Sequence, residues 1–326
     1  MGGASRGRLV GRFRMRGKGS YMIELQEISK TYRTDFWAKE FWPLNKVSFR
    51  VEQGGLVGFL GANGAGKTTA IKIIMRFIRP REGKVVFNPL LGRDFKSIFG
   101  KIGYIPERPY FYPHLTGREF VHYMGALNGV KSSVIDARMK HWSERFLIEY
   151  ALDRKLSGFS KGMLQRIGFV AALIHDPLLL ILDEPISGLD PIGRKEIKDC
   201  LKELHRSGKT IFFTSHIVSD VEEICDKVVV LEKGKLLYQG AIDQLIEENI
   251  RPNYVVRLAD YEQFALPAYV QNFEKGKGEV PVEKREEYLA AAISSGCKII
   301  SVQQNRPSLE QIIYEIRPSE LAQATK

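Results

Sequence analysis

Alternation of apolar and polar residues is clearest near the start of the chain, over residues 22–29 and 46–52. A period of two is typical of strands with one buried face. Three short runs, residues 56–60, 178–183 and 210–214, are instead almost continuously apolar. Such runs are typical of parallel strands that are covered on both faces by helices. The pattern therefore predicts an α/β fold in which an antiparallel layer lies beside a buried parallel sheet.

Helical spacing of apolar residues marks residues 70–77, 118–128 and 133–150. The last two segments predict a mostly helical region within the α/β core. Residues 227–232 and 235–239 are mostly apolar and flank a glycine-containing turn. We therefore expect these two segments to form a hairpin at the edge of the sheet.

The pattern changes after residue 250. The predicted strands there are residues 253–258, 269–273, 279–282 and 298–303, and the predicted helices are residues 286–295 and 308–316. Residues 276–278 predict a turn. This order fits a β-α-β-β-α-β arrangement whose first helix has a weak signal. Because no catalytic set of residues is visible in this part, its expected role is packing, dimerisation or regulation.

The chain length of 326 residues suits one large α/β domain and a small one. A membrane-spanning helix needs about 18–20 apolar residues in a row. The best candidate, residues 167–182, is interrupted by a His-Asp-Pro sequence. The three cysteines have no close spacing, so we expect reduced, buried thiols and neither a disulfide framework nor a metal site.

Charge is concentrated at the N-terminus. The formal net charge is +11, and residues 1–21 hold six basic residues and no acidic one. This segment is rich in glycine and lacks hydrophobic periodicity, so we expect it to be disordered. Three interpretations stay open: a start assigned upstream of Met22, an artificial tag, or a basic arm attracted to acidic lipid headgroups.

The sequence Gly-Ala-Asn-Gly-Ala-Gly-Lys-Thr-Thr at residues 61–69 fits the phosphate-binding loop pattern between a strand and a helix. Its glycines let backbone N–H groups surround phosphate oxygens, and the following helix adds its positive end. Lys67 is expected to reach the β- and γ-phosphates and Thr68 to hold Mg²⁺. The predicted nucleotide-binding residues of this loop are Gly61, Asn63, Gly64, Ala65, Gly66, Lys67, Thr68 and Thr69.

Four further motifs follow in order. They are Phe-Ser-Lys-Gly-Met at residues 159–163, an apolar run ending in Asp-Glu-Pro at 183–185, Ser-Gly-Leu-Asp at 187–190 and Thr-Ser-His at 214–216. From residue 22 to 246 the chain resembles the ATP-binding subunit of an ATP-binding cassette (ABC) transporter. The resemblance implies a P-loop NTPase core with an antiparallel β subdomain and an inserted helical subdomain over residues 22–249. A small α+β domain over residues 250–326 would follow, and residues 1–21 would precede the core.

Two acidic residues follow the apolar run. Asp183 ends a predicted strand, which places its carboxylate at the sheet edge beside the phosphates, where we expect it to hold Mg²⁺ through water. The resemblance makes Glu184 the general base that polarises the attacking water. It gives His216 contact with the γ-phosphate and that water, and it places Asp190 among the nucleotide-binding residues.

One expected contact departs from the family pattern, and another lies beside a segment of unusual length. Glu107 stands where the family usually has Gln, and its carboxylate can still bind Mg²⁺. Tyr32 matches the aromatic residue that stacks on adenine. The segment from residue 32 to 44 is about six residues longer than usual, however. It contains further aromatic side chains that compete for the adenine or simply pack: Phe36, Trp37, Phe41 and Trp42.

The resemblance also implies partners. Ser160 and Gly162 belong to the signature motif, which completes the ATP site of a second copy in a head-to-tail dimer. We therefore expect two copies to close around two ATP and two Mg²⁺ and to drive export through a separate membrane permease, at the cytoplasmic face of the membrane. The alternatives are the ATPase of an importer and a non-transport ABC switch. No nucleic-acid partner is expected.

Overall fold

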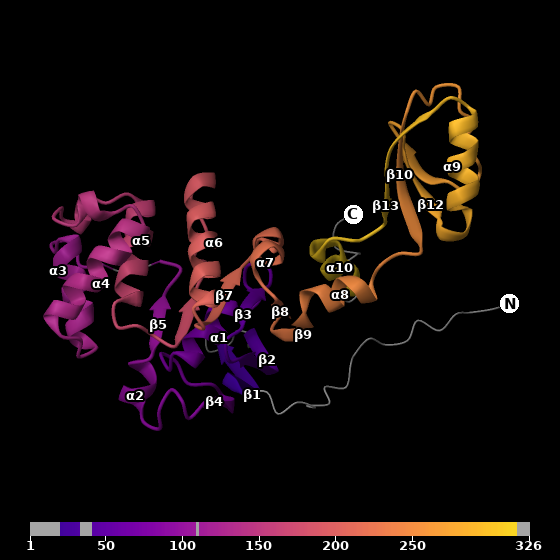
Figure 1. The fold of residues 1–326 in the computed structure, drawn as a ribbon. Helices are drawn as coiled ribbons and strands as arrows, with labels where there is room; N and C mark the ends of the chain where they lie inside the picture. The colour runs from indigo at the N-terminus through magenta and orange to yellow at the C-terminus, as the bar shows by residue number, and fades with distance from the viewer. Residues whose placement is uncertain (1–19, 33–40, 109–110, 318–326) are drawn as a thin grey trace.

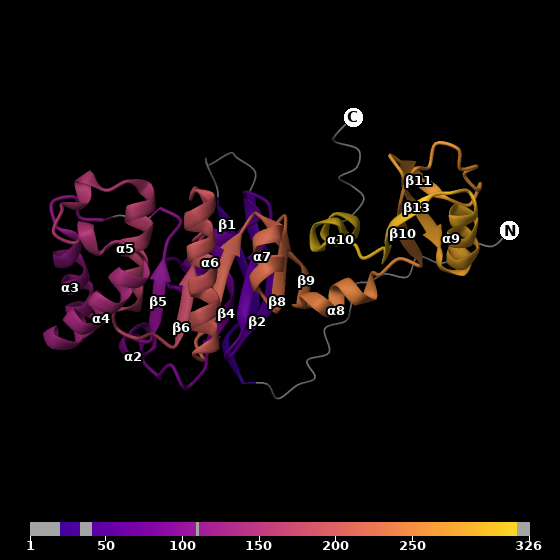
Figure 2. The ribbon, with the colours of Figure 1, turned by 45° about the horizontal axis from the view of Figure 1, so that its top comes forward.

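A computed structural model describes residues 20–32, 41–108 and 111–317 of the chain. The basic N-terminal segment up to residue 19, and the aromatic residues Phe36 and Trp37, lie outside the described residues. Two sheets belong to the larger part of the chain, which contains the phosphate-binding loop. A third sheet lies at the opposite end of the molecule from the helices α3 (Gly117–Leu127), α4 (Ser132–Arg145) and α5 (Lys161–Leu173) (Figures 1 and 2).

The predicted antiparallel layer is confirmed. β1 (Tyr21–Tyr32) is its central strand, between β2 (Phe41–Glu52) and β4 (Glu82–Phe87). β2 begins earlier than the alternation predicted, because Phe41 continues the ladder opposite Tyr32. This extension brings the start of β2 to the same side of the molecule as the phosphate-binding loop.

The predicted buried parallel sheet is also confirmed. Its strand order is β5-β6-β7-β3-β8-β9, and β9 pairs antiparallel with β8 as the predicted edge hairpin. Every side chain of β3, β6 and β7 is buried, as the apolar runs indicated. The strands are β3 (Leu56–Leu60), β5 (Ile102–Ile105), β6 (Leu179–Leu182), β7 (Thr210–Ser215), β8 (Lys227–Glu232) and β9 (Lys235–Ala241).

Helices cover this sheet and extend from it. The helices around this sheet are α1 (Lys67–Ile74), α2 (Phe95–Phe99), α3, α4, α5, α6 (Pro191–Arg206) and α7 (Val218–Ile224). α3, α4 and α5 pack together as the inserted helical region. The helix predicted to reach residue 150 ends at Arg145, because Leu147 has a left-handed backbone with φ 51°.

The third sheet has the order β11-β12-β10-β13, with α9 (Arg285–Ser294) against it. Its strands are β10 (Asn253–Ala259), β11 (Gln271–Glu274), β12 (Lys277–Pro281) and β13 (Lys298–Gln304). The weak first helix of the β-α-β-β-α-β arrangement is absent from the link of residues 260–270. Pro267 lies in that link, and proline both lacks a backbone N–H and clashes within a helix.

Two helices join this sheet to the rest. α8 (Ile242–Glu248) precedes it, and α10 (Leu309–Ile316) follows it. α10 packs against α7 and α8, and its buried side chains belong to the same apolar core as those helices. The sheet has a separate small core around Tyr288. The domain division at residue 250 stays a prediction, but α10 packs with the larger part of the chain that contains the phosphate-binding loop.

Candidate ATP-hydrolysis site

The phosphate-binding loop connects β3 to α1, and its shape requires glycine. Gly66 caps α1 with φ 108°, and a Cβ there would lie 2.0 Å from the Pro43 carbonyl oxygen. The Lys67 ammonium donates to the carbonyl oxygens of Gly61 (2.6 Å) and Ala62 (3.3 Å). The lysine is therefore buried and held over its own loop, at the position where phosphate oxygens are expected.

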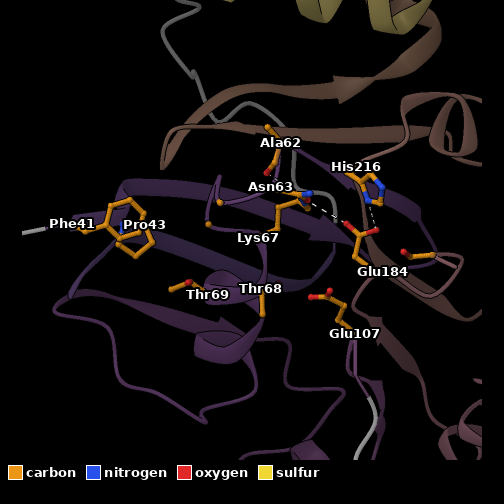
Figure 3. Close-up of a pocket in the computed structure, with 13 residues that line it drawn as sticks. Phe41, Pro43, Ala62, Asn63, Lys67, Thr68, Thr69, Glu107, Glu184 and His216 are labelled. Carbon is orange, nitrogen blue, oxygen red and sulfur yellow. Dashed lines mark hydrogen bonds and ion pairs between the residues drawn. The ribbon is translucent and has the colours of Figure 1, made fainter. Parts of the chain in front are cut away.

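A cavity of about 480 Å³ opens beside this loop (Figure 3). Its lining residues are Phe41, Pro43, Ala62, Asn63, Gly64, Gly66, Lys67, Thr68, Thr69, Glu107, Glu184, Ser187 and His216. Most of the predicted site residues thus meet in one place. Gly61 and Ala65 support the loop from behind, where a Cβ on Gly61 would lie 2.5 Å from the Leu231 carbonyl oxygen.

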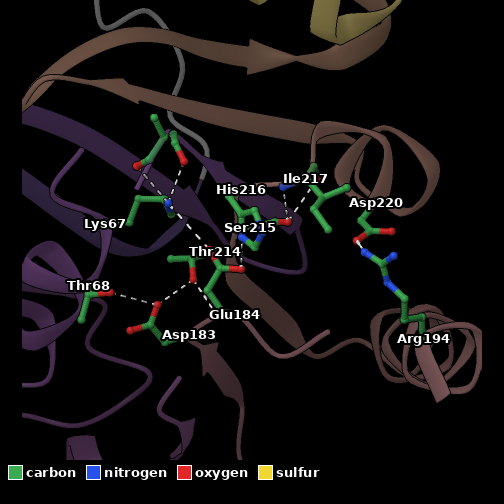
Figure 4. Close-up of polar contacts among 12 residues, drawn as sticks. Lys67, Thr68, Asp183, Glu184, Arg194, Thr214, Ser215, His216, Ile217 and Asp220 are labelled. Atoms are coloured by element: carbon green, nitrogen blue, oxygen red, sulfur yellow. Dashed lines mark hydrogen bonds and ion pairs between the residues drawn. The ribbon is translucent and has the colours of Figure 1, made fainter. Parts of the chain in front are cut away.

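Asp183 lies beneath the cavity rather than in its wall, and it is 1% exposed. Its Oδ1 is 3.4 Å from the Thr68 hydroxyl and accepts from the Thr214 hydroxyl at 2.7 Å. The same Thr214 oxygen accepts from the backbone N–H of Glu184 at 2.7 Å. Thr214 therefore fixes both acidic residues (Figure 4). The sequence motif contained Thr214, but the site prediction did not include it.

Glu184 and His216 form the reactive side of the cavity. Glu184 Oε2 is 2.8 Å from His216 Nδ1, and its Oε1 is 3.7 Å from the Lys67 ammonium. Glu184 also has a left-handed backbone with φ 52°, a conformation that costs about 1–3 kcal/mol in a residue with a side chain. The hydrogen bond to Thr214 holds the backbone there and keeps the carboxylate pointing into the cavity.

Burial disfavours charge on two of these groups. It lowers the pKa of Lys67, and the Glu184 carboxylate partly opposes this effect. Burial likewise raises the pKa of Asp183, while the Thr214 hydroxyl acts in the opposite direction. An anionic phosphate next to Lys67 and a cation next to Asp183 would both stabilise the charged forms. The site is electrostatically suited to a metal-bound polyphosphate.

The donor atoms fit Mg²⁺. The hydroxyl of Thr68 and the carboxylates of Asp183 and Glu107 supply hard oxygen ligands, which Mg²⁺ prefers. Across residues 20–32, 41–108 and 111–317, no group of three or more His, Cys, Asp or Glu side chains forms a ready metal site. The remaining ligands would therefore come from phosphate oxygens and water, which is usual for Mg²⁺.

Three predicted residues lie at the starts of helices, outside the cavity lining. Ser160 caps α5 by accepting from the backbone N–H of Met163 at 3.3 Å. Gly162 lies in the first turn of that helix. Asp190 caps α6 by accepting from the backbone N–H of Gly193 at 3.2 Å. The nucleotide contacts of all three stay predictions, and those of Ser160 and Gly162 are expected with the ATP of a second copy.

The predicted stacking residue Tyr32 lies outside the cavity lining, and its contact with adenine stays a prediction. Its ring lies 5.3 Å from the Lys30 ammonium. Phe41, directly opposite Tyr32 in the sheet, does line the cavity. In Figure 3 Phe41 and Pro43 lie across the cavity from Glu107 and Glu184. Phe41 was one of the aromatic residues in the long segment, but the sequence alone gave no reason to prefer it.

Phe41→Ala is expected to weaken ATP binding by about 5–100-fold, because stacking a base on an aromatic ring is worth about 1–3 kcal/mol. Tyr32→Ala is the matched control and should change the affinity much less. Calorimetric titration with ATP measures both. If Tyr32→Ala caused the larger loss, Tyr32 would be the stacking residue after all.

Comparisons with known proteins agree with this geometry. The family model of the ABC transporter matches residues 44–187. The chain is 38% identical to an uncharacterized ABC transporter ATP-binding protein of Synechocystis sp., over 91% of this chain and 84% of the relative. It is also 38% identical to the bacitracin transport ATP-binding protein BcrA of Enterococcus faecalis, over 70% of this chain and 72% of that protein.

A solved structure of the ATP-binding subunit of an ABC transporter has the same fold. It matches with a TM-score of 0.62 and 30% identity, over 70% of this chain and 92% of that one. The phosphate-binding loop, the acidic pair after β6 and the histidine after β7 are thus the site of an ABC-type ATPase. The chain belongs to the ABC transporter family, as an ATP-binding subunit that hydrolyses ATP.

Proposed function

We propose that this ATPase energises export through a separate membrane permease, and that two copies close around two Mg²⁺-ATP. The observation that supports hydrolysis most strongly is the placement of Lys67, Glu184 and His216 around one cavity. No helix in the described parts of the chain is long and apolar enough to cross a membrane. A permease would supply the transport path, with this chain bound at its cytoplasmic face.

Different residues of this chain would bind the phosphates, activate the attacking water and hold Mg²⁺. Lys67 turns from its loop carbonyls to the β- and γ-phosphates. Glu184 takes a proton from the attacking water, and His216 orients that water and the γ-phosphate. Mg²⁺, when bound by Thr68, Asp183 and Glu107, would neutralise the phosphate charge. Binding of the phosphates also separates Lys67 from Glu184, which frees the carboxylate to act as base.

Dimerisation would complete the site. Ser160 and Gly162 begin α5 and lie outside the cavity of their own chain. The positive N-terminal end of α5 suits a γ-phosphate. In a twofold dimer each α5 would face the ATP held by the other copy, so both sites would be equivalent.

The signature motif favours export over import, and one relative suggests a peptide as the first cargo to test. BcrA is a bacitracin transport protein. The signature of this chain, Phe-Ser-Lys-Gly-Met, resembles the variant found in exporter-type members more than the usual Leu-Ser-Gly-Gly-Gln. The importer and the non-transport switch are the competing functions.

Transport direction is tested with inside-out vesicles from cells that overproduce the chain together with the membrane protein that copurifies with it. ATP added outside should drive labelled bacitracin, used as the first probe of a panel of amphipathic peptides, into the vesicle lumen. Vesicles carrying Glu184→Gln are the matched control and should not accumulate the probe. ATP-dependent movement out of the lumen would indicate an importer, and the absence of any copurifying membrane protein would favour a non-transport switch.

A further inference from the structure

The last helix, α10, contacts an element that begins beside the catalytic histidine. Leu309, Ile312 and Ile313 share one buried apolar cluster with Val221 and Ile224 of α7. The backbone N–H of Leu309 also donates to the Glu222 carboxylate at 3.2 Å. α7 starts at Val218, shortly after His216. The first turn of α10 is therefore fixed to the helix behind the reactive side of the cavity.

The other end of α10 contacts the support of the phosphate-binding loop. The Arg317 guanidinium lies 3.5 Å from the carboxylate of Glu232, whose side chain is 13% exposed. Glu232 ends β8 and opens the turn to β9. In that turn the backbone N–H of Gly234 donates to the Ala65 carbonyl at 3.1 Å. The Leu231 carbonyl lies directly behind Gly61.

This turn also contacts the other side of the loop. The Gly234 carbonyl accepts from the backbone N–H of Asn45 at 2.8 Å. A Cβ on Gly234 would lie 2.7 Å from the Trp42 carbonyl oxygen. The turn is thus packed between β2 and the phosphate-binding loop, with almost no free space. A shift of Glu232 would be transmitted to Ala65 and Gly61, because close-packed backbone leaves little room for relaxation.

The third sheet is inserted between α8 and α10, and its two connections lie side by side. The backbone N–H of Asn305 donates to the Asn253 carbonyl at 2.9 Å, and that of Arg251 donates to the Asn305 carbonyl at 3.2 Å. Arg251 also pairs with Glu315 of α10. Movement of the sheet would therefore act directly on α10.

We propose that Arg317 is a positioning residue of the ATP site. Arg317 pairs with Glu232 and so holds the turn that supports the phosphate-binding loop. Because α10 also contacts the links to the C-terminal sheet, a movement of that sheet would change the affinity for ATP. Glu232 is mostly buried and its Oε2 makes no hydrogen bond within the described residues. Loss of Arg317 leaves this carboxylate without its opposite charge, so the turn moves to hydrate it. The proposal requires ATP binding but not export.

The proposal is tested by measuring the affinity of the full chain for ATP. Arg317→Gln is expected to raise the dissociation constant of a fluorescent ATP analogue, and the KM for ATP, by about two- to fivefold. The value of kcat at saturating ATP should not change, because the pair of Arg317 with Glu232 includes neither Glu184 nor His216. Arg306→Gln is the matched control. This substitution also removes a positive charge, but from the exposed pair of Arg306 with Asp243, whose charged atoms are 3.4 Å apart. That pair does not contact the turn that supports the phosphate-binding loop.

Rescue separates positioning from a loss of folding. Arg317→Lys keeps the charge and should restore most of the affinity. Glu232→Gln should reproduce the loss, and the double variant should lose no more than either single variant. Unchanged affinity in Arg317→Gln would overturn the proposal. So would a failed rescue by Arg317→Lys, or additive losses in the double variant.

Discussion

Glu184→Gln should lower ATP hydrolysis by about 10²–10⁴-fold while ATP binding persists. The substitution keeps the size of the side chain and its hydrogen bond to His216, which is 2.8 Å long with glutamate, but it removes the basic oxygen. It also removes the negative charge 3.7 Å from the Lys67 ammonium, which lies at the predicted γ-phosphate position. We therefore expect equal or tighter ATP binding, measured by calorimetry beside steady-state phosphate release.

Glu196→Gln on α6 is the matched control, since it removes a carboxylate that pairs with Arg166 away from the cavity. Its hydrolysis rate should stay close to that of the parent. A Glu184→Gln rate within a few-fold of the parent would exclude Glu184 as the base. The backbone position of Glu184, with its left-handed φ, would then need another explanation.

Lys67→Ala is expected to weaken ATP binding by about 10–100-fold, because hydrogen bonds to charged groups are worth about 1.5–3 kcal/mol. The substitution removes the buried cation of the site and its contacts with Gly61 and Ala62. Calorimetric titration with ATP in Mg²⁺ measures the loss. Lys72→Ala, an exposed lysine on the same helix, is the control and should bind ATP normally. Comparable ATP affinity in Lys67→Ala and the parent would contradict the assignment of the loop.

Mixing variants extends this prediction to the dimer. Lys67→Ala and Ser160→Arg should each be inactive alone. In a mixed dimer one site would carry both lesions and the other neither, so hydrolysis should partly recover as protein concentration rises. No recovery would indicate that Lys67 and Ser160 serve the ATP site of the same chain.

Local sequence patterns were sufficient for the ATP-binding part. Alternation and apolar runs identified β1, β3 and β7, and the loop spacing identified Lys67 and Thr68, because these features depend on neighbours in sequence. Glu107, Glu184 and His216, which are far apart in the sequence, line the same cavity. These residues lie at or just beyond the same edge of one sheet, so their meeting follows from the parallel order of the strands.

Features that depend on distant packing were missed. Phe41 reaches the cavity because the β1–β2 ladder extends further than the alternation does. α10 has a clear amphipathic pattern, but the pattern does not say which core it covers, and α7 and α8 accept its apolar face. The role of Thr214 depends on contacts with Asp183 and Glu184 across neighbouring strands. The sequence offers no local signal for any of these three contacts.

We propose that an ATP site built on Lys67 and Glu184 is completed by α5 of a second copy. The most direct measurement is a structure of the Glu184→Gln protein with Mg²⁺-ATP. We expect a twofold dimer in which the Ser160 hydroxyl of one copy is within hydrogen-bonding distance of the γ-phosphate bound by Lys67 of the other. A closed, ATP-bound dimer in which Ser160 lies far from every γ-phosphate would contradict it.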